Sequence, residues 1–581
     1  MHPTSPTIAL DYPVERELSL RAVSTGIVIG VLLTPSNVYA GLKIGWSFNM
    51  SIIALLIGYG IWQGLAKRSA EQRPWTLHES NINQTVASAA ASIISGGLVA
   101  PIPAYTLLTG QQLDVIPMIA WVFSVSFLGI WIAWYLRPSL LNDKALKFPE
   151  GMATLETLLH IYNQGHEAAK RLKVLLSAAL LSGLVKWVDT FIWAFPRWSP
   201  TPQLERLTFT ADPSLLLVGF GGIIGIRVGL TLLLGALLAW GGLAPWLLEQ
   251  GLVQLPPDSS GPQFAALVEW LLWPGVSLMV CSTLTSLAIR LWALHKSTKA
   301  GGGATWVVPK TGPASGFLVA IVLVVSLQAL LFGINPWMAL LTIPLAICLA
   351  AVAARVVGAT GIAPIGAIGQ LSQLSFGIVA PGQVPINLMS ANTAGGSAGQ
   401  CTDLMNDFKV GRAIGATPHK QLIAQTLGIF VGSIVGVLAY LTLIPDPQSM
   451  LLTQEWPAPA VATWKAVAQT LTLGLDSLSA SIRWAVIIGA VAGLLLGILD
   501  SVLPVHRARY LPSTAALGLA FVLPASVSLM MALGAILTWL VSCRWASLTE
   551  RFAITAAAGL IAGESITGVG ASLWQMVGNG G

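Results

Sequence analysis

The chain has 581 residues, of which 55% are hydrophobic and only 9% are charged. A soluble domain usually carries about 25% charged residues, so these charges cannot cover a water-facing surface for a chain of this length. The composition excludes a soluble enzyme, a disordered chain and a nucleic-acid-binding protein. The apolar 55% amounts to about 320 residues, which at roughly 20 residues per crossing limits the spans to about 16. The sequence therefore predicts an all-α polytopic membrane protein.

Apolar runs predict the spans in chain order, at 20–40, 45–66, 83–108, 115–136, 172–195, 214–249, 264–292, 314–333, 337–356, 384–401, 420–444, 481–503, 512–543 and 552–574. Several runs exceed one crossing or contain Pro and Gly. We therefore expect 13 to 16 transmembrane helices, including broken or re-entrant segments. Continuous Leu-, Ala- and Gly-rich runs argue against the alternating strands of a β-barrel.

Basic residues indicate the orientation of the spans. The chain has 30 Lys and Arg against 24 Asp and Glu, a net charge of +6. Loops 250–263 and 445–464 are rich in proline and poor in Lys and Arg, whereas Lys and Arg gather at 67–73, 137–147, 170–173, 290–310, 409–420 and 507–509. The positive-inside rule then places the N-terminus in the cytoplasm. We expect a multi-pass protein of the cell inner (plasma) membrane, whose first span inserts without cleavage because no signal-peptide pattern precedes it.

The Gly-rich stretch near residue 300 divides the chain. We expect a cytoplasmic tail at 1–19, a first transmembrane half at 20–299, a linker at 300–313 and a second half at 314–581. Three short similarities favour an internal duplication, which is common among secondary transporters. They pair 144–151 with 507–514, 81–85 with 392–393, and 222–227 with 559–564.

Polar residues inside apolar surroundings are costly, so they mark candidate sites. The first group, Asn37, Tyr39 and Lys43, follows Pro35 at the end of the first span. Pro35 and nearby glycines are expected to break the helix and to expose backbone groups to a cavity. An interfacial turn with a snorkelling Lys43 is an equal alternative.

The second group opens the span near residue 83 and contains Asn81, Asn83, Gln84 and Thr85. Ser80 could cap this helix, but capping explains one or two polar residues rather than six in seven. The small residues that follow allow a neighbouring helix to approach closely. We interpret the group as the wall of a polar cavity.

The third group centres on Glu150, directly after Pro149. Proline suits the first turn of a helix, and a carboxylate there lies at the positive end of the helix dipole. The apolar run that follows is too short to cross a membrane, so we expect a re-entrant or broken helix. An amphipathic cytoplasmic helix is the alternative.

The fourth group spans 387–407 and includes Ser390, Asn392, Thr393 and Asp403. This segment is too polar to face lipid and must face protein or water. Asp403 and Asp407 are four residues apart and share one helix face. Lys409 and Arg412 follow and could simply neutralise them.

The fifth group pairs an intramembrane carboxylate, Glu564, with an intramembrane cation, Arg227. Such charges are functional candidates by default, and the sequence leaves open whether the two interact. Gly489, Gly493 and Gly497 form a doubled GxxxG pattern, which predicts a helix-packing face instead of a site.

Five fragments together resemble the oligopeptide transporter family, which includes peptide carriers and yellow-stripe-like carriers of metal chelates. They are 37–43 (NVYAGLK), 81–92, 148–151 (FPEG), 400–420 and 559–564 (GLIAGE). The resemblance runs from about 20 to 575 and is that of a bacterial-type member. It implies cation-coupled, specifically proton-coupled, uptake of small oligopeptides or peptide-like metal chelates.

We therefore expect a secondary transporter working by alternating access, without a cofactor, a resident metal or a catalytic residue. The expected substrate-binding residues are Asn37, Tyr39, Lys43, Asn81, Asn83, Gln84, Thr85, Arg227, Ser390, Asn392 and Thr393. Glu150, Asp403 or Glu564 is expected to carry the coupling proton. The sequence leaves open whether the chain forms a homodimer.

Two other functions compete with transport. A channel is compatible with the proline breaks, although no repeated filter sequence is visible. An intramembrane serine hydrolase would use Ser397 in a GxSxG match with His419 downstream, but that motif needs a preceding strand that a helical segment does not provide. The absence of a GxxxxGK[ST] sequence argues against ATP binding by this chain.

Overall fold

The computed structural model describes residues 17–45, 49–66, 68, 74–143, 146–163, 165–253, 263–299, 314–361, 365–508 and 510–578. The expected linker at 300–313 and most of the expected tail at 1–19 lie outside these ranges. Within them the regular secondary structure is all helical, apart from one isolated bridge between Trp198 and Ala211. The all-α fold class is confirmed.

The helices of residues 17–299 are α1 (Leu20–Ile44), α2 (Ser51–Ala66), α3 (Leu77–Ala91), α4 (Pro101–Thr109), α5 (Val115–Leu141), α6 (Pro149–Asn163), α7 (Gly165–Phe191), α8 (Pro202–Arg206), α9 (Leu215–Ala236), α10 (Ala244–Glu249) and α11 (Phe264–Lys299). A 3₁₀ turn, η1 (Ser92–Gly96), follows α3, and a π turn, η2 (Leu237–Leu243), follows α9.

The helices of residues 314–578 are α12 (Ala314–Phe332), α13 (Pro336–Thr360), α14 (Ile365–Val379), α15 (Ala391–Ala413), α16 (Pro418–Leu443), α17 (Pro447–Met450), α18 (Pro459–Leu473), α19 (Ala480–Val502), α20 (Val505–Ala508), α21 (Thr514–Val522), α22 (Ala525–Arg544) and α23 (Ala546–Gly578). A π turn, η3 (Ile386–Ser390), leads into α15, and a 3₁₀ turn, η4 (Leu475–Ser477), precedes α19.

Among the described residues, 12 segments are long and apolar enough to cross a membrane. The sequence led us to expect 13 to 16. Part of the difference lies in α2, which has only 16 residues, and in α15, which is too polar to count as a lipid-facing span. The segments Leu77–Thr109 and Leu215–Glu249 each combine more than one helical element into a single long candidate.

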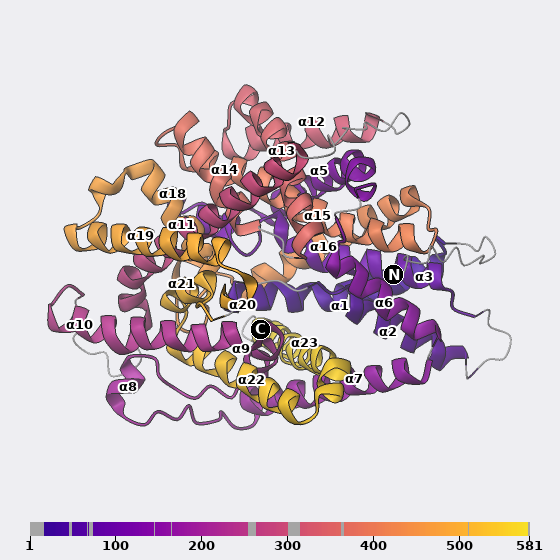
Figure 1. The fold of residues 1–581 in the computed structure, drawn as a ribbon, viewed down its shortest axis with the longest axis horizontal. Coiled ribbons are helices and arrows are strands. Elements are labelled where there is room, and N and C mark those ends of the chain that lie inside the picture. The colour runs from indigo at the N-terminus through magenta and orange to yellow at the C-terminus, as the bar shows by residue number, and fades with distance from the viewer. Residues whose placement is uncertain are drawn as a thin grey trace.

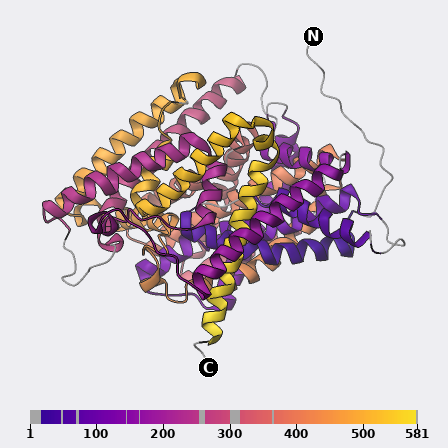
Figure 2. The same ribbon diagram turned by 90° about the horizontal axis from the view of Figure 1, so that it is seen from below.

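Helices from both parts of the sequence pack against one another. In the lower part of Figure 1, α7 and α9 lie beside α22 and α23, and Figure 2 shows α11 and α19 running side by side. Gly493 of α19 is close to α11, where an added Cβ would lie 2.4 Å from the Leu278 carbonyl oxygen. Gly489, Gly493 and Gly497 are all buried, which confirms the predicted packing face.

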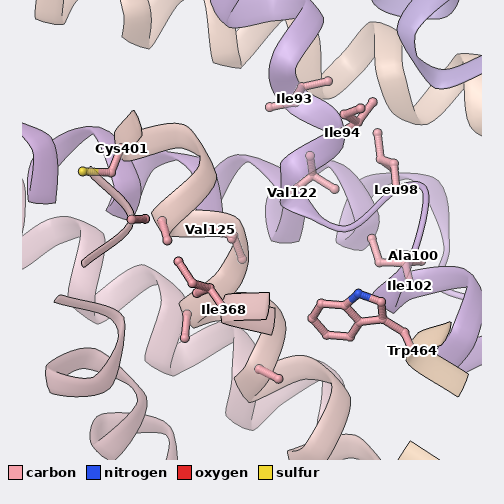
Figure 3. Close-up of a cluster of buried hydrophobic side chains, with 14 of the residues drawn as sticks. Ile93, Ile94, Leu98, Ala100, Ile102, Val122, Val125, Ile368, Cys401 and Trp464 are labelled. Carbon is pink, nitrogen blue, oxygen red and sulfur yellow. The ribbon is translucent and has the colours of Figure 1, made fainter. Parts of the chain in front are cut away.

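The main apolar core also draws on both parts of the chain. In Figure 3, Ile93 and Val122 lie in one cluster with Ile368, Cys401 and Trp464. Dispersion and burial of this apolar surface against other protein hold the central helices together. The polar α15 passes through this interior, as expected for a segment that cannot face lipid.

Helix breaks occur, but not at Pro35. Helix α1 continues through Pro35 and ends at Gly45, whose φ of 72° is left-handed. The predicted break is therefore wrong, because close packing of Gly26 and Gly30 against Val86 and Ala90 of α3 keeps α1 continuous. A break does occur within α9 at Gly225, whose φ of 80° and ψ of 169° lie outside the helical region.

Candidate functional site

A cavity of about 450 Å³, here called the charged pocket, lies among the ends of α1, α7, α9 and α22 and the middle of α23. Several of its walls come from loops that flank these helices. Its charged lining residues are Lys43, Lys186, Asp189, Arg197, Asp212, Glu455 and Glu564. The pocket therefore presents three basic and four acidic side chains to one cavity.

Lys43 lies at the C-terminal end of α1 in an aromatic corner of this pocket. Its Nζ donates to the Glu455 carbonyl oxygen at 2.6 Å and lies 5.0 Å from the centre of the Trp456 ring. Tyr39, one turn earlier on α1, contacts Trp456 edge-on with ring centres 5.3 Å apart. The ammonium group is thus held by a carbonyl and by ring faces that attract cations.

Glu564, from the middle of α23, lies at the N-terminus of α9. Its carboxylate accepts from Ser214 Oγ at 2.6 Å and from the Leu216 backbone N–H at 2.7 Å. Ser214 is itself the N-cap of α9, where its Oγ accepts from Leu217 N–H. The Glu564 carboxylate therefore satisfies free N–H groups of another helix and lies at the positive end of its dipole.

Lys186, Asp189, Asp212, Arg197 and Glu455 complete the charged pocket but were not among the predicted site residues. Lys186 and Asp189 form an ion pair at 3.7 Å, and Asp189 also accepts from the Phe195 N–H at 2.9 Å. Both lie within the apolar run at 172–195, where a charged residue is costly, so the sequence alone could have identified them as candidate site residues. The other three belong to loops, where charges are ordinary and give no signal.

Arg227 does not line the charged pocket. Its Nη2 pairs with Asp500 Oδ1 at 2.6 Å, and its Nε donates to the Leu511 carbonyl oxygen at 2.9 Å. Because Glu564 is engaged by α9 and Arg227 by Asp500, these two intramembrane charges have different partners. The question that the sequence left open is answered against a direct pair.

A second polar region, here called the acidic cluster, is defined by Glu150, Asp403 and Asp407. Asp407 Oδ1 accepts from Gln84 Nε2 at 3.0 Å, and Glu150 Oε2 accepts from Asn406 Nδ2 at 3.1 Å. These bonds bring the predicted second, third and fourth groups together where α3, α6 and α15 meet. The predicted polar wall and two of the predicted carboxylates thus belong to one region, in which Asp407 is buried, Asp403 is half-buried and Glu150 is exposed.

Close helix approach forms this cluster. A Cβ added at Gly151 would lie 2.7 Å from the Asn406 carbonyl oxygen, so only glycine lets the start of α6 approach α15 so closely. Several amide atoms here are buried without a hydrogen-bond partner among the described residues: Asn81 Nδ2, Gln84 Oε1 and Asn406 Oδ1. Such atoms leave donors and acceptors available within the protein interior.

The basic residues after the cluster do not neutralise it in the described structure. Lys409 Nζ donates to the Leu146 carbonyl oxygen at 3.2 Å, and Arg412 Nη1 donates to the Leu141 carbonyl oxygen at 2.7 Å. Neither side chain forms an ion pair with Asp403 or Asp407 within the described ranges. The simple neutralisation considered from the sequence is therefore not what these side chains do.

The remaining predicted residues join helices or bond within their own helix and do not line the charged pocket. Asn37 donates to the Ala91 carbonyl oxygen, Asn83 donates to that of Ala54, and Asn392 donates to that of Gly96. Ser390 donates to Gln328 Oε1, and Thr393 donates to the Met389 carbonyl oxygen. Thr85 accepts from Gln84 Nε2. Of the predicted substrate-binding residues, Tyr39 and Lys43 line the charged pocket, and Glu564 lines it beside them.

Ser397 is fully buried within α15, and its hydroxyl donates to the Ala394 carbonyl oxygen at 3.2 Å. It lies in a continuous helix, without the strand and sharp turn that expose the nucleophile of a serine hydrolase. His419 is an exposed residue near the start of α16. The arrangement gives no support to a hydrolase.

An all-helical membrane protein with a charged pocket among its helices matches the architecture of membrane transport proteins. A model of the OPT oligopeptide transporter protein family matches residues 17–575, so the chain belongs to this family.

Similar proteins occur in fungi, plants and bacteria. A putative oligopeptide transporter of Saccharomyces cerevisiae is 24% identical, with 96% of each chain covered. The iron-phytosiderophore transporter yellow stripe 1 of Zea mays is 23% identical over 95% of this chain and 89% of its own. A putative oligopeptide transporter of Haemophilus influenzae is 25% identical over 91% of both.

Proposed function

We propose that this protein is a secondary active transporter that takes up small oligopeptides or peptide-like metal chelates and binds them in the charged pocket. The observation that carries the proposal is the mixed charge of one cavity in a member of a transporter family. Relatives named as transporters of oligopeptides and of an iron-phytosiderophore support the same two substrate classes.

The charge pattern suits a zwitterion. A peptide or an amino-acid-like chelator carries both amino and carboxylate groups, and each needs an opposite charge once it leaves water. Lys43, Lys186 and Arg197 can receive carboxylates, while Asp189, Asp212 and Glu564 can receive ammonium groups. A cavity of about 450 Å³ lies within the range of about 300–1,000 Å³ that small-molecule sites occupy.

We propose proton coupling through Glu564, Glu150 or Asp403. A proton on Glu564 would remove an acceptor from Ser214 or Leu216 and loosen the contact between α9 and α23. In the acidic cluster, unpartnered amide atoms beside Asp407 and Glu150 give a protonated carboxyl group partners to bind. Protonation at either place would change which helices are tied together, as alternating access requires.

We also propose the inner (plasma) membrane as the location, with the N-terminus in the cytoplasm, and an internal duplication about the 300–313 linker. The charged pocket gathers the C-terminal end of α1 and residues of the loop before α18, which the positive-inside rule places away from the cytoplasm. Substrate would then enter from the non-cytoplasmic side.

Uptake by purified protein in proteoliposomes tests this function. Tri- and tetrapeptides and iron–chelator complexes are supplied with and without an inward proton gradient. We expect saturable accumulation driven by the gradient, and a channel would instead give flux that does not saturate. Accumulation that ignores the gradient would refute proton coupling.

Variants identify the coupling group. Glu564→Gln, Glu150→Gln and Asp403→Asn each keep size while removing the titrating carboxylate. We expect the coupled uptake of at least one variant to fall while substrate exchange without a gradient persists. Unchanged coupled uptake in all three would remove these carboxylates from the mechanism.

A further inference from the structure

A second cavity, of about 360 Å³, lies where α5 ends, α15 ends and α16 begins. We call it the arginine cavity, and it shares no lining residue with the charged pocket. Its lining includes Arg137, Leu141, Phe408, Arg412 and Pro418. Nothing in the proposed transport mechanism uses it.

Three helix ends place the arginine cavity near a membrane surface. It also lies on the side of the N-terminus, because Glu17, just before α1, accepts from Thr417 N–H at 2.9 Å and from Thr417 Oγ1 at 2.6 Å. Thr417 directly precedes Pro418 of the cavity wall. Lys43 of the charged pocket is at the opposite end of α1. The two cavities are therefore at opposite ends of this helix.

The cavity is basic, and no carboxylate lines it. The Arg137 guanidinium stacks 4.1 Å from the centre of the Trp134 ring and 5.5 Å from that of Phe408. Its Nη1 is buried and has no hydrogen-bond partner among the residues that the structure describes. Aromatic stacking holds the plane of the guanidinium fixed, and a donor on it is left free to bind an acceptor.

Arg412 contributes the second guanidinium. Its Nη1 donates to the Leu141 carbonyl oxygen at 2.7 Å and to Asn142 Oδ1 at 2.9 Å, which fixes the side chain at the cavity rim. Neither Arg137 nor Arg412 forms an ion pair within the described part of the chain. Two positioned guanidinium groups without a carboxylate form a site for an anion with several oxygens, of which phosphate is the best match.

Apart from Asn142, which binds Arg412, and Gly415, the remaining lining is apolar. Pro138, Leu141, Phe408, Ala416 and Pro418 form walls that a hydrated inorganic ion would not need. A phospholipid offers both a headgroup phosphate for the arginines and a glycerol–acyl region for these walls. Basic pockets between helices on the cytoplasmic side are where anionic lipids bind.

We propose that the arginine cavity binds the phosphate group of an anionic phospholipid, with Arg137 and Arg412 as its ligands. Phe408 and Arg412 belong to α15, the helix that also carries Asp403 and Asp407. A bound headgroup therefore contacts the helix of the acidic cluster and bridges it to α5. This inference does not depend on the substrate or on proton coupling.

Intact-protein mass spectrometry of the delipidated full-length protein tests the site. The protein in neutral detergent is titrated with phosphatidylglycerol, with phosphatidylcholine, or with inorganic phosphate, and adducts are counted by mass. We expect one phosphatidylglycerol adduct that survives collisional activation at which phosphatidylcholine is lost. Equal retention of both lipids would overturn the proposal, and a phosphate adduct without preference for phosphatidylglycerol would identify free phosphate as the ligand and overturn the lipid assignment.

Arg137→Gln and Arg412→Gln should each raise the phosphatidylglycerol concentration needed for half occupancy at least tenfold. Arg412 is exposed, so its variant should fold even if the variant of the half-buried Arg137 does not. Arg483→Gln is the matched control, since Arg483 lines neither cavity and pairs with the fully exposed Asp476. Unchanged occupancy in the Arg412 variant, or an equal loss in the Arg483 control, would refute the site.

Discussion

Arg21 Nε donates to Glu79 Oε1 at 2.6 Å and joins the start of α1 to the start of α3. The Arg21 guanidinium also lies over the rings of Trp62 and Trp75, which stack 5.1 Å apart. Glu79 completes a capping box with Thr76 at the first turn of α3. This contact holds the N-terminal ends of α1 and α3 together, at the opposite end of α1 from Lys43 and the charged pocket.

Replacing Arg21 by Met should destabilise the protein, because it leaves the Glu79 carboxylate buried without its cation. The Glu79 side chain is only 3% exposed, whereas that of Arg21 is 24% exposed. We expect a loss of about 2–3 kcal/mol, below the roughly 3–5 kcal/mol of a fully buried pair. Thermal unfolding in detergent measures it. The control Arg483→Gln removes a surface pair and should leave the melting temperature unchanged.

Lys43→Gln should weaken substrate binding in the charged pocket. The substitution removes the cation held between Glu455 and Trp456, while the side chain stays polar and similar in length. We expect KM for peptide uptake to rise about tenfold or more, equivalent to about 1.4 kcal/mol of lost binding. Lys147→Gln is the comparison, since Lys147 is exposed and does not line the pocket. Equal KM values for both variants would contradict a role for Lys43 in binding.

Ser214→Ala should loosen the junction between α9 and α23. The Ser214 hydroxyl donates to Glu564 and caps α9, so its removal costs a cap and a hydrogen bond to a carboxylate. These losses sum to about 2–4 kcal/mol, which thermal unfolding can detect. Thr201→Ala removes the exposed cap of the five-residue α8 and should cost less. A Ser214 variant no less stable than the Thr201 variant would show that this junction is not important.

Gly493→Ala should disrupt the packing of α19 on α11. The new Cβ would lie 2.4 Å from the Leu278 carbonyl oxygen, so one helix must move. We expect a cost of about 1–3 kcal/mol, measured by thermal unfolding. Gly570→Ala in α23 is the control, because no atom lies within 4 Å of its added Cβ and alanine favours a helix. A stable Gly493 variant would argue against this interface.

The helical fold could be predicted from composition because a chain in lipid must satisfy its backbone hydrogen bonds internally, as a helix does. Continuous apolar runs predicted the helices, and the polarity of 387–407 predicted that α15 would be buried in protein. The predicted break at Pro35 was wrong because it considered only the local tendency of proline to break a helix and not the packing of α1 against α3. That packing is a tertiary contact and leaves no local trace in the sequence.

The candidate site was predictable only in part. Glu564, Tyr39 and Lys43 were recognisable as polar residues in apolar surroundings, and all three line the charged pocket. Asp212 and Glu455 come from loops, where a charge is unremarkable until the fold places it beside α1. The partner of Arg227 is Asp500, 273 residues away, and no spacing rule reaches that far.

The kink at Gly225 separates two segments of α9 with different attachments. The N-terminal segment is fastened to α23 through Glu564, and the segment beyond Gly225 is fastened to Asp500 of α19 through Arg227. Gly225, with its positive φ, interrupts the helical conformation between them. The two segments can therefore change their relative orientation at this residue. A displacement of the N-terminal segment of α9 at the charged pocket can be accommodated by backbone rotation at Gly225, while the Arg227–Asp500 ion pair stays in place.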